Sequence, residues 1–221
     1  AGNLADLTTA GVTATNFGVA NDAALFSAFS VTSQTELNDL LAWTRGWTNS
    51  AKTTKRGWIM GDILNSRPVA INYGARGTYT QANPDLRLLV GTNAGLLHLF
   101  SADNGAENWA FMPRRMAGIQ SLRRSNVESA DTVYGVDAPP VIYRYDANND
   151  GSIKTSDNDK VYAYVGLRRG GRALYALNLS DPDNPAFLWK IDNATTGFSE
   201  LGQTWSTPTV ARVKGHTNPV L

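Results

Sequence analysis

The sequence LLVGTNAGLLHLF at residues 88–100 decides the fold of this chain, because its pattern returns at residues 162–177 as YAYVGLRRGGRALYAL. In both copies an apolar run ends in Val-Gly, a short break follows, and a second apolar run begins. A polar turn and a segment around Trp109 or Trp189 then close each copy. Short apolar runs separated by turn residues predict β-strands, and their recurrence predicts a repeated structural unit.

A Pro-led segment precedes each copy, which gives the repeating unit four strands. These segments are residues 67–71 and 139–143, and a third follows at 207–211. Proline is tolerated at the start of a strand, where the ladder needs no N–H donor. Four-stranded antiparallel units in series are typical of propeller blades, and these segments look like blades of quinoprotein-type propellers. A sandwich of unrelated hairpins is the alternative, and the repeat argues against it.

We therefore predict an all-β fold that is part of a β-propeller. Residues 61–221 form this partial propeller, with blades near 66–112 and 138–192 and the start of a third near 206–214. Propellers need at least about four blades, so we expect the chain to be an excerpt of a longer protein.

The N-terminal residues 1–60 are predicted to be irregular apart from one helix. Residues 1–32 are rich in Ala, Thr, Asn and Gly and have no clear period. Ser33 and Glu36 have the spacing of a capping box, and leucines follow at helical spacing, so a helix is expected from about Gln34 to Arg45. A short second helix is expected at residues 116–122, inside the longest insertion between strands.

Composition and charge exclude several classes of function. The 221 residues include 20 Lys+Arg and 19 Asp+Glu, so the large basic excess that nucleic-acid binding needs is absent. No apolar run approaches the roughly 18 residues of a membrane span, so the chain is not expected to be transmembrane. The chain has no Cys, which rules out thiolate metal sites and a Cys nucleophile.

Residues 146–157, DANNDGSIKTSD, have the spacing of a calcium-binding loop. Calcium takes six to eight oxygen ligands, supplied in such loops by positions 1, 3, 5, 7 and 12, with Gly at position 6 for the sharp turn. Gly151 stands at the sixth position, and Asp157 rather than the common Glu closes the loop. The predicted ligands are Asp146, Asn148, Asp150, Ser152 and Asp157.

The flanks of this loop alternate like strands, so we expect a calcium loop placed between two strands of the second blade. Lys154 at position 9 lowers the local negative charge and favours weak binding, in the micromolar to millimolar range. The alternative is a polar hairpin tip without a ligand, since turns favour Asp, Asn and Gly.

Four segments resemble one family of bacterial proteins. The strings GDILNSRPV (61–69), VGTNAGLLHLF (90–100), WAFMP (109–113) and YGVDAP (134–139) are similar to motifs of the PilY/PilC family of type IV pilus tip adhesin and assembly proteins. Ala138 stands where that family usually has Gly. The resemblance runs from about Leu37 to the C-terminus and covers the C-terminal propeller region of the family.

The resemblance implies a non-enzymatic protein that binds Ca2+ in an EF-hand-like loop. It implies action in pilus biogenesis, in calcium-regulated extension and retraction during twitching motility, and in surface adhesion. The implied location is the bacterial cell surface, at the pilus tip or outer membrane, after secretion through the periplasm. The implied partners are minor pilins and a host or abiotic surface. The family loop often has Asp at position 9, where this chain has Lys154, and the Arg-Gly-Asp adhesive motif is absent.

Two other functions remain open at this stage. A pyrroloquinoline-quinone dehydrogenase uses the same type of blade, although such enzymes often carry adjacent cysteines beside the cofactor. A non-catalytic scaffold propeller, with the acidic loop acting only as a turn, is the other alternative.

Overall fold

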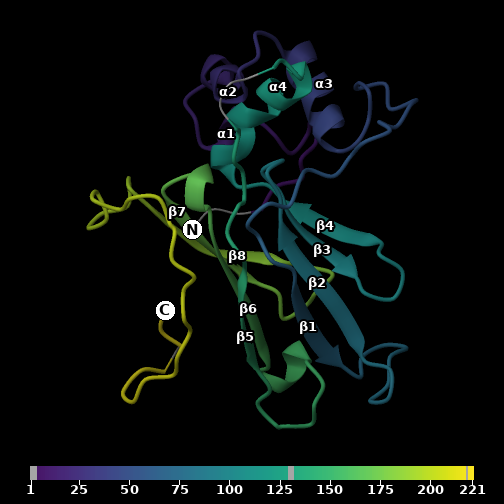
Figure 1. Cartoon of the computed structure of the whole chain (residues 1–221), viewed down its shortest axis with the longest axis vertical. Helices are drawn as coiled ribbons and strands as arrows, with labels where there is room; N and C mark the ends of the chain where they lie inside the picture. The colour runs from purple at the N-terminus through teal and green to yellow at the C-terminus, as the bar shows by residue number, and fades with distance from the viewer. Residues whose placement is uncertain (1–3, 129–131, 218) are drawn as a thin grey trace.

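Two four-stranded antiparallel sheets form the main part of the molecule (Figure 1). The computed structural model describes residues 4–128, 132–217 and 219–221. The first sheet has the order β1 (Val69–Gly74), β2 (Asp85–Gly91), β3 (Leu97–Ser101) and β4 (Glu107–Phe111). The second has the order β5 (Val141–Tyr145), β6 (Lys160–Gly166), β7 (Ala173–Asn178) and β8 (Ala186–Asp192). Both copies of the repeat thus form the predicted four-stranded units.

The two sheets also share their register. The tryptophan of each last strand lies opposite the third strand, Trp109 opposite Leu99 and Trp189 opposite Ala176. Directly after these pairs both ladders have an irregularity, because the last strand, β4 or β8, contains one extra residue. An irregularity at the same place in both copies shows that the repeat extends from the sequence to the details of strand pairing.

The hydrophobic core lies between the two sheets. Buried side chains of β1, β2 and β3 form one cluster with those of β6 and β7. Among the hydrogen bonds that cross this interface, Tyr73 Oη donates to the Leu179 carbonyl at 2.8 Å, and Trp109 Nε1 donates to the Pro182 carbonyl at 2.7 Å. Trp109 is half-buried against the core.

Helices form a second, smaller unit at one end of the sheets (Figure 1). They are α1 (Ala14–Phe17), α2 (Asp22–Phe29), α3 (Gln34–Thr44) and α4 (Ala117–Ser125), the last preceded by the 3-10 helix η1 (Arg114–Met116). Their apolar side chains pack in a cluster of their own. The helix predicted from about Gln34 to Arg45 is present as α3, and the one predicted at residues 116–122 is present as α4.

The prediction that residues 1–32 are irregular was wrong. Thr13 and Asn21 cap α1 and α2, since their side-chain oxygens accept hydrogen bonds from the N–H groups of Asn16 and Ala24 at 3.1 and 3.0 Å. Helices this short show almost no apolar period. Their conformation depends on packing, of α1 against α2 and of α2 against α3 and α4.

No third sheet forms within the described residues. Where the start of a third blade was predicted, near 206–214, the chain makes a single antiparallel bridge between Ala211 and Val220. A strand needs a neighbour for its backbone groups, and the described part of the chain places none beside this segment. The structure therefore shows two blade-like sheets without closure of a ring.

Candidate metal centre

The acidic loop joins β5 to β6 and lies at the lower end of the molecule as drawn in Figure 1. It comprises residues 146–159 and contains the 3-10 helix η2 (Thr155–Asp157). Asn149 and Gly151 have left-handed backbone conformations, with φ of 58° and 83°. These two residues allow the chain to curl, which brings the side chains at alternate positions to its inner side.

Three side chains of the loop accept hydrogen bonds from backbone N–H groups a few residues further on. The carboxylate of Asp146 accepts from Gly151 at 2.9 Å, and the carboxylate of Asp150 accepts from Ser152 at 2.7 Å. The amide oxygen of Asn148 accepts from the N–H of Asp150 at 3.1 Å. These bonds hold three of the predicted ligands in a fixed order around the loop.

One oxygen of Asp146 is left without a partner. The Asp146 side chain is only 10% exposed, and its Oδ1 atom is buried and accepts no hydrogen bond. The guanidinium of Arg144 lies 3.6 Å from the other oxygen, Oδ2. A buried carboxylate oxygen without a donor is costly, so this atom indicates a place for a cation.

The carboxylates of Asp150 and Asp157 approach each other around two nitrogen atoms. The Lys154 ammonium lies 2.9 Å from Asp150 Oδ2 and 3.8 Å from Asp157 Oδ2. The amide nitrogen of Asn148 lies 3.4 and 3.2 Å from the same two oxygens. The hydrogen bond from Lys154 is the main cause that lowers the pKa of Asp150, and the same contact raises the pKa of Lys154.

Asp159 organises the loop, and sequence reasoning missed it. Its carboxylate is fully buried; one oxygen accepts from the N–H of Ala147 at 2.8 Å and the other from the N–H of Lys154 at 2.9 Å. Asp159 therefore ties the beginning of the loop to its middle. The signal in the sequence was a further carboxylate directly before β6, just beyond the twelve-residue pattern.

The loop also packs against the first sheet. Ile153 is buried in the common core, and its N–H donates to the carbonyl of Tyr73 in β1 at 2.8 Å. Gln81 donates to the carbonyl of Asp150 at 3.0 Å, and Arg144 donates to the carbonyl of Gly151 at 3.0 Å. The loop thus connects its own sheet to the neighbouring one.

Sequence comparison identifies relatives of this chain. It is 34% identical over 188 residues to the type IV pilus biogenesis factor PilY1 of Pseudomonas aeruginosa strain UCBPP-PA14, covering 76% of this chain and 15% of the relative. It is 33% identical over 191 residues to a PilY1 homologue of Xylella fastidiosa, covering 75% of this chain and 14% of that protein. No protein-family model matches the chain.

The chain is homologous to PilY1. The resemblance to the PilY/PilC family is therefore confirmed. The crystal structure of the Pseudomonas aeruginosa PilY1 C-terminal domain is 31% identical in sequence and has a TM-score of 0.40, covering 64% of this chain and 25% of that one. The chain spans about 15% of the length of the PilY1 proteins it matches.

Three of the four segments that resemble PilY/PilC motifs, residues 61–69, 90–100 and 134–139, are hydrogen-bonded to one another. Asn65 donates to both oxygens of the buried Asp137 carboxylate at 3.0 and 2.9 Å. Asn93 donates to Asp62 at 2.7 Å and accepts from the N–H of Gly135 at 3.2 Å. These motif residues are hydrogen-bonded to one another, which gives them a structural role in this homologue of PilY1.

The residues of the acidic loop suit the calcium ion that the PilY/PilC resemblance implies. Asp146, Asn148, Asp150 and Asp157 lie in one curled loop and offer hard oxygen ligands, and the unpartnered Asp146 oxygen is the observation that favours an ion there. No group of three or more His, Cys, Asp or Glu placed to hold a metal occurs in the described part of the chain. Asp146, Asp150 and Asp157 therefore do not converge on one point in this structure. Asn148 and Ser152 are the other two predicted ligands.

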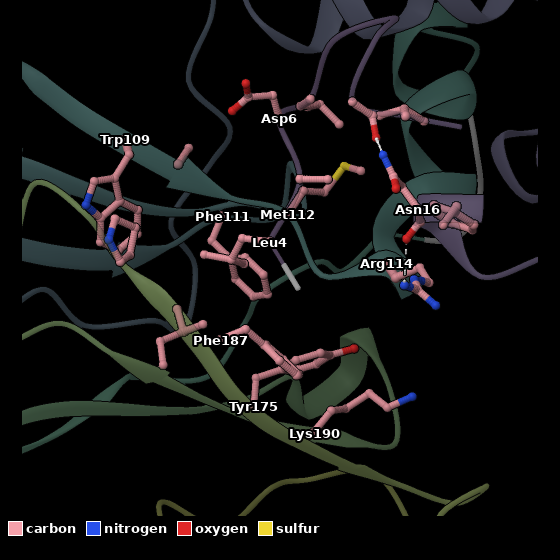
Figure 2. A pocket seen from close by; sticks show the side chains of 18 of the residues that line it. Leu4, Asp6, Asn16, Trp109, Phe111, Met112, Arg114, Tyr175, Phe187 and Lys190 are labelled. Carbon is pink, nitrogen blue, oxygen red and sulfur yellow. Dashed lines mark hydrogen bonds between the residues drawn. The ribbon is translucent and has the colours of Figure 1, made fainter. Parts of the chain in front are cut away.

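A cleft of about 1150 Å³ lies between the N-terminal segment and the outer strands β4 and β8. Figure 2 shows Leu4, Phe111, Tyr175 and Phe187 around its centre, with the charged side chain of Lys190 at its margin. The rings of Phe111 and Tyr175 meet edge to face at 5.9 Å. The lining combines apolar side chains with charged ones such as Asp6, Arg114 and Lys190. Among the described residues, no helix is long and apolar enough to cross a membrane.

Proposed function

We propose that this chain is the calcium-binding propeller portion of a type IV pilus biogenesis factor. It acts without enzymatic activity at the bacterial cell surface, at the pilus tip or outer membrane, after export through the periplasm. Its partners are pilus components, in particular minor pilins, and a host or abiotic surface. The homology to PilY1 supports the pilus role, and the unpartnered buried oxygen of Asp146 in the acidic loop supports the calcium site.

Calcium would stabilise the interface between the two sheets. Asp146, Asn148, Asp150, Ser152 and Asp157 would hold the ion, which supplies positive charge that offsets the repulsion between carboxylates. The same loop contacts β1 through Ile153, so holding the loop also holds the first sheet against the second. Calcium occupancy would thereby regulate how firmly this region transmits force during extension, retraction and surface attachment.

A calcium titration of the purified chain tests the metal site. The wild type should melt at a higher temperature in millimolar calcium than in chelator, because a ligand at about 100 times its Kd adds roughly 2.7 kcal/mol to stability. Asp146→Asn should weaken calcium binding at least tenfold while retaining the melting temperature in chelator, since a neutral amide at this buried position suffers less from lacking a partner. Equal calcium affinity in both proteins would contradict the proposed site.

A chimera tests the pilus role. The matching region of Pseudomonas aeruginosa PilY1 is replaced by this chain, and surface pili are counted in a strain that lacks its own PilY1. The chimera should restore pili, and a PilY1 from which the region is deleted should not. An intact, exported chimera that restores no pili would contradict the proposed role of this chain.

A further inference from the structure

We propose that Lys154 is an internal counter-ion of the acidic loop, which calcium must displace in order to bind. This inference rests on the proposed calcium site and specifies what sets its affinity. The Lys154 ammonium lies between two of the predicted ligands, 2.9 Å from Asp150 and 3.8 Å from Asp157. An ammonium and a calcium ion cannot occupy the same place between these carboxylates.

The loop is built to remain ordered with the ammonium in this position. The N–H of Lys154 is held by the buried carboxylate of Asp159, so the Lys154 backbone is fixed while its side chain turns back over the loop. The side chain is 45% exposed and can therefore leave for solvent when another cation arrives. Arg144, the other cation at this loop, lies against Asp146 and is anchored to the Asn72 carbonyl at 2.9 Å, so it does not share the position of Lys154.

The two ends of the site differ in how their negative charge is neutralised. Asp146 keeps an unpartnered buried oxygen at one end, whereas Lys154 neutralises Asp150 and Asp157 at the other. Calcium gains the free oxygen directly but competes with the ammonium for the remaining carboxylates. Lys154 therefore keeps the loop stable without metal and lowers its affinity for calcium.

The experiment compares Lys154→Met with the wild type and with Lys190→Met. Lys190 is a matched control, because it forms a Lys–Asp ion pair with Asp192 at 2.6 Å and is 42% exposed, but lies on β8 outside the loop. Calcium Kd is measured by calorimetry, and melting temperatures are measured in chelator and in saturating calcium. Lys154→Arg, which keeps the charge, is the conservative variant.

We expect Lys154→Met to bind calcium about three- to tenfold more tightly than the wild type, and Lys190→Met and Lys154→Arg to bind like the wild type within about twofold. In chelator both Met variants should melt about 1–3 °C below the wild type. Saturating calcium should remove this deficit for Lys154→Met only. Calcium binding by Lys154→Met but not by the wild type would also support the inference.

An unchanged Kd in Lys154→Met, beside a wild type that binds calcium, would overturn this inference and leave the proposed site standing. A deficit of Lys154→Met that persists in saturating calcium would overturn it equally. If neither the wild type nor Lys154→Met binds calcium, the proposed site fails, and the inference fails with it.

Discussion

At the scale of single residues, two aspartates of the acidic loop have different tasks. Asp146 has an oxygen that no protein group satisfies, whereas both oxygens of Asp159 are satisfied by backbone N–H groups. The first carboxylate is suited to a ligand, and the second holds the loop in shape. Identical side chains thus differ in role because their hydrogen-bond partners differ.

Asp159→Ala should destabilise the fold by about 3 kcal/mol, with or without calcium. The substitution removes two hydrogen bonds to a buried charge and leaves the N–H groups of Ala147 and Lys154 without acceptors. Urea denaturation in chelator measures the loss. Asp157→Ala is the comparison, because Asp157 is partly exposed and its removal should cost under about 1 kcal/mol without metal. Equal losses in the two variants would refute the structural role of Asp159.

At the scale of elements, the strands were predictable from the sequence and the short helices were not. The Pro-led segments, the Val-Gly breaks and the tryptophans placed all eight strands, because the same pattern occurs in both blades. By contrast, α1 and α2 depend on the caps Thr13 and Asn21 and on packing against distant helices. The candidate loop was predictable from its spacing, but Asp159 and the position of the Lys154 ammonium depend on three-dimensional folding of the loop.

The close approach of β1 to the acidic loop explains a glycine at the end of that strand. Gly74 has a φ of 72°, and a Cβ atom there would lie 2.1 Å from the carbonyl oxygen of Gly151. Gly77 has a similar φ of 58°, but a Cβ atom there would meet nothing within 4 Å. A side chain at either glycine would strain the backbone, but only a side chain at Gly74 would also clash with the acidic loop.

Gly74→Ala should destabilise the protein by several kcal/mol, whereas Gly77→Ala should cost only about 1–2 kcal/mol for its left-handed backbone. Gly74→Ala should also weaken calcium binding, because the loop must move away from β1. Denaturation and calorimetry on both variants check these outcomes. Equal stability of the two variants would show that the loop does not press on β1 as described.

At the scale of the whole molecule, a few buried polar contacts fix how the two sheets meet. Tyr73 reaches from β1 to the Leu179 carbonyl at 2.8 Å, beside a core that both sheets share. Burial is the main cause that raises the pKa of Tyr73 above the ordinary tyrosine range. The folded state therefore keeps the phenol protonated at a pH where the unfolded chain ionises it.

Tyr73→Phe should cost about 1–3 kcal/mol at pH 8, because the buried Leu179 carbonyl loses its donor. The raised pKa contributes stability that is complete below the unfolded pKa of about 10 and is lost as the pH rises through the folded value. The wild type should therefore lose its advantage over Tyr73→Phe above about pH 10.

Tyr175→Phe is the control. Burial raises the pKa of Tyr175 to about 12, but its side chain lines the cleft and does not reach the Leu179 carbonyl. The stability difference between the wild type and Tyr175→Phe should also shrink above about pH 10, but Tyr175→Phe should lose less stability at pH 8 than Tyr73→Phe. Equal losses of stability in both variants at pH 8 would contradict an inter-sheet role for the Tyr73 hydroxyl.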